Sequence, residues 1–163
     1  MLQQWRQSQL VPAETAAIQL RPMHAADLPA VLQLERRSQR DPWSGWCFRG
    51  LLRRNASCWV YTLNDRLIGF GMMAIDRGWA HIMNLCIAPA FRKQGLGRRL
   101  LLHMLQLAHK QGVRRAWLEV RPSNRVAITL YNSLGFEPRQ RRRGYYRQSP
   151  RGQRDALVMV RRL

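Results

Sequence analysis

The sequence contains few cysteines and no recognisable metal-binding pattern. Its 163 residues include three cysteines, Cys47, Cys58 and Cys86, whose spacing does not match a ligand motif such as Cys-x-x-Cys. Cys58 and Cys86 lie in apolar segments typical of strands. We therefore expect buried free thiols, a reducing compartment such as the cytoplasm, and no bound metal.

Long hydrophobic runs are also missing. No stretch approaches the roughly 18 apolar residues that would span a membrane, and Met1–Leu10 has no apolar segment typical of a signal peptide. A hydrophobic content of 46% excludes a disordered polycation, and the length suits a single domain with its own core. We predict a partly mobile N-terminal extension over residues 1–17 and one folded domain over residues 18–163.

Acidic residues and lysines are scarce, whereas arginine is abundant. Nine Asp and Glu stand against 28 Lys and Arg, which gives a formal net charge of +19. Only Lys93 and Lys110 are lysines, so 28 − 2 = 26 cationic residues are arginines. Basic patches are typical of nucleic-acid binding, but these arginines are dispersed, and the densest run is 139–143. Dispersed surface charge is the simpler interpretation, and proximity to RNA or to the ribosome remains the alternative.

The hydrophobic pattern predicts an α/β domain. Period-two segments rich in β-formers alternate with segments of helical period, and turn or capping residues such as Asp27, Ser44, Gly112 and Asn124 separate them. The expected fold is a central mixed, mostly antiparallel sheet of about seven strands flanked by about four helices. The strands are expected at 18–21, 58–63, 67–75, 80–87, 115–121, 136–141 and 156–160, and the helices at 27–39, 44–52, 98–111 and 124–134.

A glycine turn between a strand and a helix is the first candidate site. It consists of Arg92, Lys93, Gln94, Gly95, Leu96, Gly97 and Arg98. Glycines allow a close approach of the backbone to a ligand, and the free N–H groups of the following helix favour an anion such as pyrophosphate. The spacing is neither that of a Walker loop nor that of a dinucleotide-binding fingerprint. Because such turns are common, the pattern alone is of limited specificity.

Glu119 and Tyr131 are the second and third candidates. Glutamate is depleted in strands, yet Glu119 lies within one, on the face opposite Ala116 and Leu118. Such a carboxylate could act as a general base, or it could simply pair with Arg121 at a solvated surface. Tyr131 shares a helical face with apolar residues, so a core tyrosine is the simpler interpretation of its residue type.

Together these features resemble the GCN5-related N-acetyltransferase (GNAT) family. Arg92-x-x-Gly95-x-Gly97 is similar to the family's pyrophosphate-binding signature, and the resemblance extends from about residue 18 to residue 163. A narrower resemblance is to the members that acetylate the N-terminal alanine of a ribosomal protein. Four segments carry it, in their joint order and spacing: 42–44, 118–121 with Ser123 and Asn124, 130–136, and 142–146 with Asp155 and Ala156.

The resemblance implies a role for each candidate. Acetyl-CoA would lie in a splay between two central strands, with Glu119 as general base and Tyr131 as general acid. The backbone of Leu85, Cys86 and Ile87 would face the pantetheine arm, 93–98 would surround the pyrophosphate, and Asn124 would bind the cosubstrate. The substrate side is expected to include Trp43, Tyr145, Tyr146 and Asp155.

The implied acceptor is a protein N-terminal α-amine, specifically the N-terminal alanine of a small-subunit ribosomal protein. An α-amine has a pKa of about 7.7–8.0, so a carboxylate removes its proton more readily than that of a lysine, near 10.4. Because such a substrate has a basic tail, local acids such as Glu35, Asp41 and Asp155 would have to offset the charge of +19. The alternatives are an acetyltransferase for lysines or small amines, and a non-catalytic RNA- or ribosome-binding domain.

Overall fold

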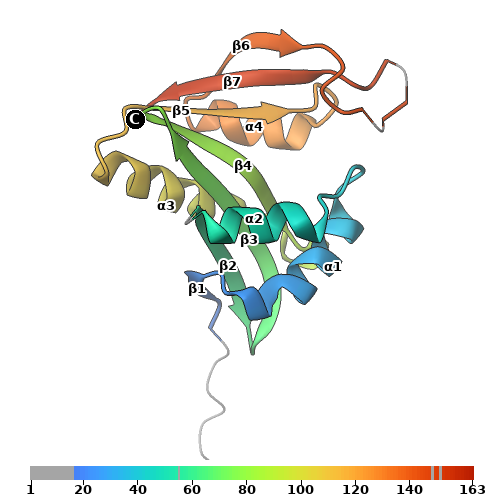
Figure 1. Cartoon of the computed structure of the whole chain (residues 1–163), viewed down its shortest axis with the longest axis vertical. Helices are drawn as coiled ribbons and strands as arrows, with labels where there is room; N and C mark the ends of the chain where they lie inside the picture. Colours follow the sequence, from blue (N-terminus) through green and yellow to red (C-terminus); the bar gives the residue numbers. More distant parts are fainter. Residues whose placement is uncertain (1–16, 55, 148, 151) are drawn as a thin grey trace, which may run out of the picture.

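The computed structural model describes residues 17–163 except 55, 148 and 151, and Figure 1 shows its arrangement. The extension predicted over 1–17 therefore lies, apart from its last residue, outside the described residues. The expected class is confirmed, because the described part of the chain forms one seven-stranded sheet with four α-helices. No helix in this part is long and apolar enough to cross a lipid bilayer.

The elements follow the predicted order with small shifts at their ends. The strands are β1 (Gln19–Pro22), β2 (Ser57–Leu63), β3 (Arg66–Asp76), β4 (Trp79–Ile87), β5 (Arg115–Val120), β6 (Glu137–Arg142) and β7 (Ala156–Arg162). The helices are α1 (Leu28–Ser38), α2 (Gly45–Arg53), α3 (Leu96–Lys110) and α4 (Arg125–Ser133). The largest shifts are two residues each: α3 begins two residues before its predicted start, where Leu96 is already buried in the core, and β7 extends two residues beyond its predicted end.

The sheet opens between β4 and β5, the feature that positions the site. The strand order is β1-β2-β3-β4-β5-β7-β6, and every neighbouring pair is antiparallel except β4 and β5. Their parallel ladder runs from the Trp79–Arg115 pair only as far as Ile82–Leu118. The β3–β4 register shifts so that Met83 is an extra residue, and a bulge of this kind bends a strand. The ends of β4 and β5 therefore diverge, as Figure 1 shows.

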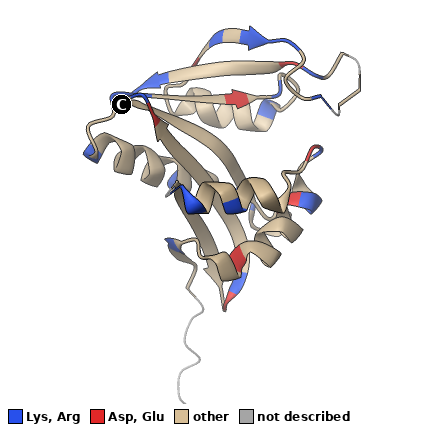
Figure 2. Ribbon diagram, in the orientation of Figure 1, with Lys and Arg blue, Asp and Glu red and all other residues tan. Residues whose placement is uncertain are grey.

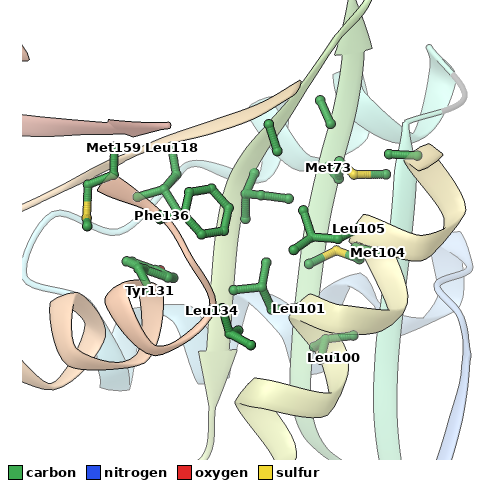
Figure 3. Close-up of a cluster of buried hydrophobic side chains, with 14 of the residues drawn as sticks. Met73, Leu100, Leu101, Met104, Leu105, Leu118, Tyr131, Leu134, Phe136 and Met159 are labelled. Atoms are coloured by element: carbon green, nitrogen blue, oxygen red, sulfur yellow. The ribbon is translucent and has the colours of Figure 1, made fainter. Parts of the chain in front are cut away.

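Two apolar cores cover the two faces of the sheet. The larger core packs α3 and α4 against the sheet, and Figure 3 shows Leu101, Met104, Leu118, Tyr131 and Phe136 within it. The smaller core packs α1 and α2 against the other face through Val31, Phe48, Val60, Phe70 and Met72. Both helical pairs are amphipathic, so burial of one stripe on the sheet stabilises them and leaves the opposite stripe to water.

Turns and caps confirm most of the local expectations and correct two. Gly112 and Gly135 have the positive φ angles expected after a helix, 83° and 78°, and Asn124 Oδ1 accepts a hydrogen bond from Ala127 N at 3.2 Å as a helix cap. Asp27 stands at the expected N-cap position of α1, but its side chain does not cap that helix. A 3₁₀ turn (Ala25–Asp27) precedes that helix, and the Asp27 carboxylate binds His24 N and Arg21 instead.

Ser44 stands at the expected cap position of α2, but its side chain does not cap the helix. Its hydroxyl lies 3.4 Å from Cys47 Sγ. Helix α2 is instead held by the burial of Phe48.

Candidate active site

A cavity of about 150 Å³ lies in the splay between β4 and β5. Met83, Asn84 and Leu85 line it from β4, and Glu119 and Val120 line it from β5. Helix α4 contributes from one face of the sheet, and the α1–α2 region contributes from the other. The remaining lining residues are Glu35, Gln39, Asp41, Trp43, Ile82, Arg121, Asn124, Ala127, Tyr131, Tyr145 and Tyr146. The opening of the sheet thus brings together both predicted proton-transfer residues.

Glu119 is held firmly at this cavity. Its side chain is only 5% exposed, on the face of β5 opposite the buried Leu118, as the alternation predicts. One carboxylate oxygen lies 2.7 Å from His81 Nε2, and the other accepts a hydrogen bond from Arg142 Nη1 at 2.8 Å. The predicted alternative partner, Arg121, binds Asp41 instead.

The partners of Glu119 are themselves fixed by stacking. The His81 ring lies parallel to the Trp117 indole with centroids 3.7 Å apart. The Arg142 guanidinium lies 5.4 Å from the same Trp117 ring. These contacts restrict the rotation of the carboxylate, so its remaining lone pairs keep one orientation in the cavity.

Tyr131 reaches the cavity from α4 and remains protonated. Burial raises the pKa of its hydroxyl to about 12, and the side chain is almost enclosed, with the Phe136 ring 5.9 Å away. Its ring belongs to the larger core, as the simpler interpretation expected, while its position at the cavity also suits a proton donor. The structure thus confirms the core packing of Tyr131, and its role as a proton donor stays a prediction.

The end of β4 offers an unpaired backbone edge toward the splay. Leu85, Cys86 and Ile87 pair with β3 on one side, but the ladder to β5 has already ended at Ile82. An extended ligand could therefore hydrogen-bond to the free side of this strand. Cys86 itself is buried in the smaller core, and burial raises the pKa of its thiol, so it packs rather than acts as a nucleophile.

The glycine turn forms an open N-terminus for α3. Lys93 and Gly95 both have positive φ angles, 60° and 77°, and no atom lies within 4 Å of a Cβ built on Gly95. A Cβ on Gly97 would make ordinary contacts of 3.7 and 3.8 Å with Ile87 and Leu130. The first backbone N–H groups of an α-helix have no partner within the helix, and the open space beside Gly95 leaves room for an anion at this end of α3.

Side chains of the turn brace it from both directions. Arg92 Nε donates to the carbonyl of Ile87 at 2.9 Å, which ties the turn to β4. Arg98 Nη1 donates to Ser133 Oγ at 2.8 Å, which ties α3 to α4. Gln94 Nε2 lies 3.5 Å from the carbonyl of Ala90. The basic side chains of Arg92, Lys93 and Arg98 are exposed beside the helix N-terminus.

Three of the four substrate-side candidates meet at the cavity, and one does not. Trp43, Tyr145 and Tyr146 line it. Burial is the main cause that raises the pKa of both tyrosines. Asp155 lies outside the lining, because its oxygens accept hydrogen bonds from Gly144 N and Arg141 Nε and hold the base of the β6–β7 loop. We therefore treat Asp155 as a loop-holding residue.

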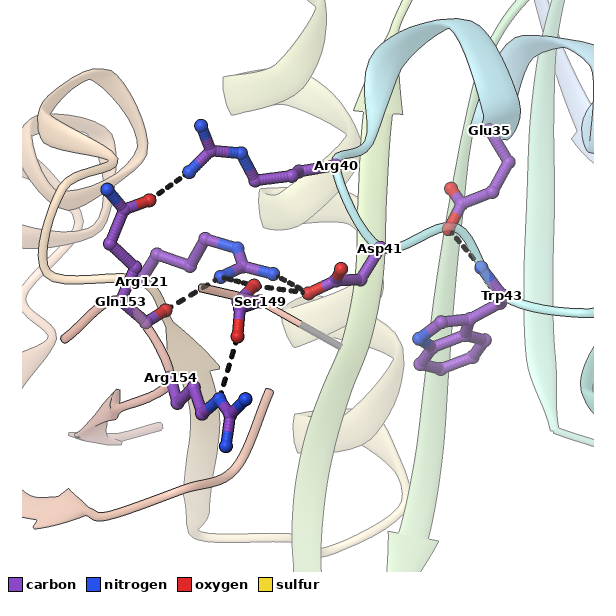
Figure 4. A network of polar contacts seen from close by, with 8 residues as sticks. All are labelled: Glu35, Arg40, Asp41, Trp43, Arg121, Ser149, Gln153 and Arg154. Carbon is purple, nitrogen blue, oxygen red and sulfur yellow. Dashed lines mark hydrogen bonds and ion pairs between the residues drawn. The ribbon is translucent and has the colours of Figure 1, made fainter. Parts of the chain in front are cut away.

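A polar network that the sequence analysis missed closes one wall of the cavity (Figure 4). Arg121 and the hydroxyl of Ser149 both donate to the carboxylate of Asp41, which joins the α1–α2 connection to the β6–β7 loop. Arg121 also donates to the backbone carbonyl of Gln153 at 3.1 Å. Its guanidinium lies 3.7 Å from the Tyr146 ring. The Ser149 hydrogen bond holds the pKa of Asp41 below its usual range.

Glu35 is a third acid at the cavity, and its hydrogen-bond partners among the described residues are neutral. It is 1% exposed and accepts hydrogen bonds from Trp43 N at 3.0 Å and Asn84 Nδ2 at 3.2 Å. Burial raises the pKa of its carboxyl group. Of the three acids expected to offset the basic surface, Glu35 and Asp41 therefore lie at the cavity and Asp155 does not.

His81 and Arg142 are the other site residues that sequence reasoning missed. A lone histidine in a strand and one arginine among 26 carry no distinguishing signal. Strand alternation could have placed His81 on the same sheet face as Met83. The hydrogen bond between His81 and the Glu119 carboxylate, however, depends on how β4 and β5 pair in the folded sheet.

Sequence comparison places the chain in a known family. Residues 18–136 match the acetyltransferase (GNAT) family, and the chain belongs to that family. The [ribosomal protein bS18]-alanine N-acetyltransferase of Salmonella typhimurium is 38% identical over 138 residues, which are 85% of this chain and 93% of that protein. The Escherichia coli protein of the same description is 36% identical over 138 residues, which are again 85% of this chain and 93% of that protein.

Solved structures agree with this assignment. The crystal structure of the ribosomal-protein-S18-alanine N-acetyltransferase from Escherichia coli superposes with a TM-score of 0.81 at 34% identity, covering 90% of this chain and 94% of that one. Ard1 from Thermoplasma volcanium gives a TM-score of 0.82 at 26% identity, covering 90% and 98% of the two chains. The family resemblance inferred from the sequence is confirmed.

Proposed function

We propose that the protein transfers the acetyl group of acetyl-CoA to the N-terminal α-amine of a protein. The observation that carries this proposal is that one cavity, in the splay of the sheet, is lined by Glu119, Tyr131 and the unpaired end of β4. The open N-terminus of α3 supplies a fitting site for a pyrophosphate beyond that end. Acetyl-CoA supplies an activated thioester carbonyl, and the residues of the chain bind, orient and exchange protons.

Each residue then has a defined task. Glu119 accepts the proton of the attacking amine, directly or through water, because its carboxylate is held at the cavity by His81 and Arg142. A free N–H group along Leu85–Ile87 stabilises the negative charge that develops on the carbonyl oxygen. Tyr131, whose pKa is raised to about 12, keeps its proton at neutral pH and donates it to the departing thiolate.

For the acceptor we propose the N-terminal alanine of the small-subunit ribosomal protein bS18. The support is the description of relatives that are 36–38% identical over most of both chains. Three acids, Glu35, Asp41 and Glu119, line the cavity against one arginine, Arg121, in a chain whose net charge is +19, which favours a positively charged N-terminal segment there. A bacterial ribosomal substrate would be met in the cytoplasm, so we propose this location for the protein.

The proposal is tested by thiol release from acetyl-CoA with a peptide that begins with alanine. We expect thiol release only when the peptide has a free α-amine. An otherwise identical peptide with a blocked N-terminus serves as the control. Equal thiol release from both peptides would contradict the proposed acceptor.

Replacement of Tyr131 by phenylalanine tests the general acid. Phenylalanine keeps the packing against Phe136 and removes only the hydroxyl, so we expect the fold to survive. Loss of one proton transfer should lower kcat by about 10²-fold. The same change at Tyr61, which is buried in the larger core and does not line the cavity, is the control for the loss of a buried tyrosine hydroxyl. A kcat of Tyr131→Phe within twofold of wild type, measured by thiol release, would remove the acid role.

His81→Phe tests whether the imidazole positions Glu119. The phenyl ring can still stack on Trp117, but the hydrogen bond to Glu119 is lost. A hydrogen bond to a charged group is worth about 1.5–3 kcal/mol, so we expect kcat to fall by roughly 10- to 10²-fold with little change in KM for acetyl-CoA. His81→Gln, which can donate a hydrogen bond, should recover part of the rate, and an equal loss in both variants would argue against positioning.

A further inference from the structure

A second cavity lies at the opposite end of β4 and β5 and is strongly basic. It has a volume of about 670 Å³ and is lined by Trp79, Arg115, Leu134, Gly135, Glu137, Arg139, Val160, Arg161 and Arg162. Four of these nine residues are arginines and one is an acid. We refer to this cavity as the basic groove, and Figure 2 shows basic residues gathered near the C-terminus, where β7 ends and β5 begins.

The arginines of the basic groove are incompletely neutralised. Glu137 binds Arg139 at 3.2 Å, at an exposed pair that contributes little to stability. Among the described residues, Nη1 of Arg161 is buried and has no hydrogen-bond partner. The other three arginines of the groove have no acidic partner in the part of the chain that the structure describes, so the groove keeps positive charge that favours a ligand with acceptor oxygens.

The groove also carries an aromatic platform. The Arg115 guanidinium lies 5.1 Å from the centroid of the Trp79 ring. Arginine binds phosphate oxygens through its two-pronged donor geometry, and tryptophan and arginine planes stack on nucleobases. A nucleic-acid strand offers both phosphates for the guanidinium groups and planar bases that can stack on the indole. An acidic peptide offers carboxylates but no planar base, so it matches the groove less well.

We propose that the basic groove binds the phosphate backbone of RNA. Arg115 and Glu119 are four residues apart on β5, so the groove lies about 13 Å from the acceptor cavity at roughly 3.3 Å per residue. RNA in the groove leaves that cavity open to a protein N-terminus. The groove thereby gives a role to part of the net charge of +19, and it does so independently of the proposed acetyl transfer.

The test uses a labelled single-stranded RNA of about 16 nucleotides and fluorescence anisotropy over a series of salt concentrations. The variant combines Arg139→Gln, Arg161→Gln and Arg162→Gln. The control combines Arg36→Gln, Arg37→Gln and Arg49→Gln, which removes the same charge from exposed positions of α1 and α2. Loss of three phosphate contacts should weaken binding at least about tenfold and reduce the slope of log K against log salt by about 2, while the control changes little.

Several outcomes would overturn the proposal. Equal losses in variant and control would show that the charge acts diffusely. Groove-dependent binding of polyglutamate without binding of RNA would point to an acidic protein. Circular dichroism and thermal unfolding verify that both variants fold. If the triple variant does not fold, Arg139→Gln alone, at an exposed position of the edge strand β6, should reduce the slope by about 0.7. Because RNA binding is measured without acetyl-CoA, its failure is separate from failure of the proposed transfer.

Discussion

Glu119→Gln is expected to lower kcat by at least about 10²-fold while the affinity for acetyl-CoA stays nearly unchanged. Glutamine has the same size and can keep one contact with Arg142, so the cavity should retain its shape. It cannot accept a proton from the amine at neutral pH. The loss should therefore appear in the chemical step, which rapid measurement of thiol release separates from cosubstrate binding by calorimetry.

The matched control is Glu137→Gln, the same substitution at an exposed position of β6. Its kcat should equal that of the wild type. If Glu119→Gln turned over as fast as Glu137→Gln, the carboxylate of Glu119 would not be the base. A loss of acetyl-CoA binding equal to the loss of kcat would instead indicate a structural role for Glu119.

Gly97→Glu is expected to weaken acetyl-CoA binding by about 10²-fold or more. The substitution places a carboxylate in the first turn of α3, where the pyrophosphate is proposed to bind. Two like charges about 4 Å apart repel by about 4 kcal/mol at an effective dielectric constant of 20, which exceeds the roughly 2.7 kcal/mol that corresponds to 10²-fold. Calorimetric titration with CoA measures the effect directly.

Two further variants separate charge from bulk at this position. A Cβ on Gly97 meets only ordinary contacts at 3.7 and 3.8 Å, so Gly97→Ala should bind CoA nearly as tightly as the wild type. Gly97→Gln has the size of the glutamate variant without its charge. Its affinity for CoA should lie between those of Gly97→Ala and Gly97→Glu. Tight binding of CoA by Gly97→Glu would refute the location of the pyrophosphate.

Local chemistry explains why the sequence predicted so much of the fold. Asn64 and Asp65 adopt positive φ angles of 48° and 60° between β2 and β3, as a tight hairpin between twisted strands requires. The alternation of buried and exposed residues along β5 is enough to place Glu119 on the face opposite the core, without knowledge of its hydrogen-bond partners. These are short-range signals, because the neighbouring residues themselves determine the backbone conformation or the buried face.

The partners in the site could not be predicted in the same way. Arg121 meets an acid 80 residues away, and Ser149 bonds to the same acid across 108 residues. Nothing local distinguishes Asp41 from another loop aspartate. The side chain of Asp27 does not cap α1 for a related reason, since the nearby Arg21 and the backbone of His24 compete for its carboxylate. The resemblance to a family supplied the candidates for proton transfer, Glu119 and Tyr131, but the side chains that hold them depend on tertiary contacts.

The distribution of charge also depends on tertiary structure. In the sequence the arginines are dispersed, but in the fold four of them line one groove at the starts of β4 and β5. Two of the few acids, Glu35 and Asp41, join Glu119 at the cavity at the other end. Acids and arginines that are scattered in the sequence are therefore gathered at different ends of β4 and β5 in the fold.

The most direct test of the central claim is to locate the acetyl group on the acceptor by mass spectrometry. The protein is incubated with acetyl-CoA and peptides that carry either a free N-terminal alanine, a blocked N-terminus with an internal lysine, or both amines. The account predicts acetylation of the α-amine in the first and third peptides and no modification of lysine. Acetylation confined to the lysine ε-amines would contradict it.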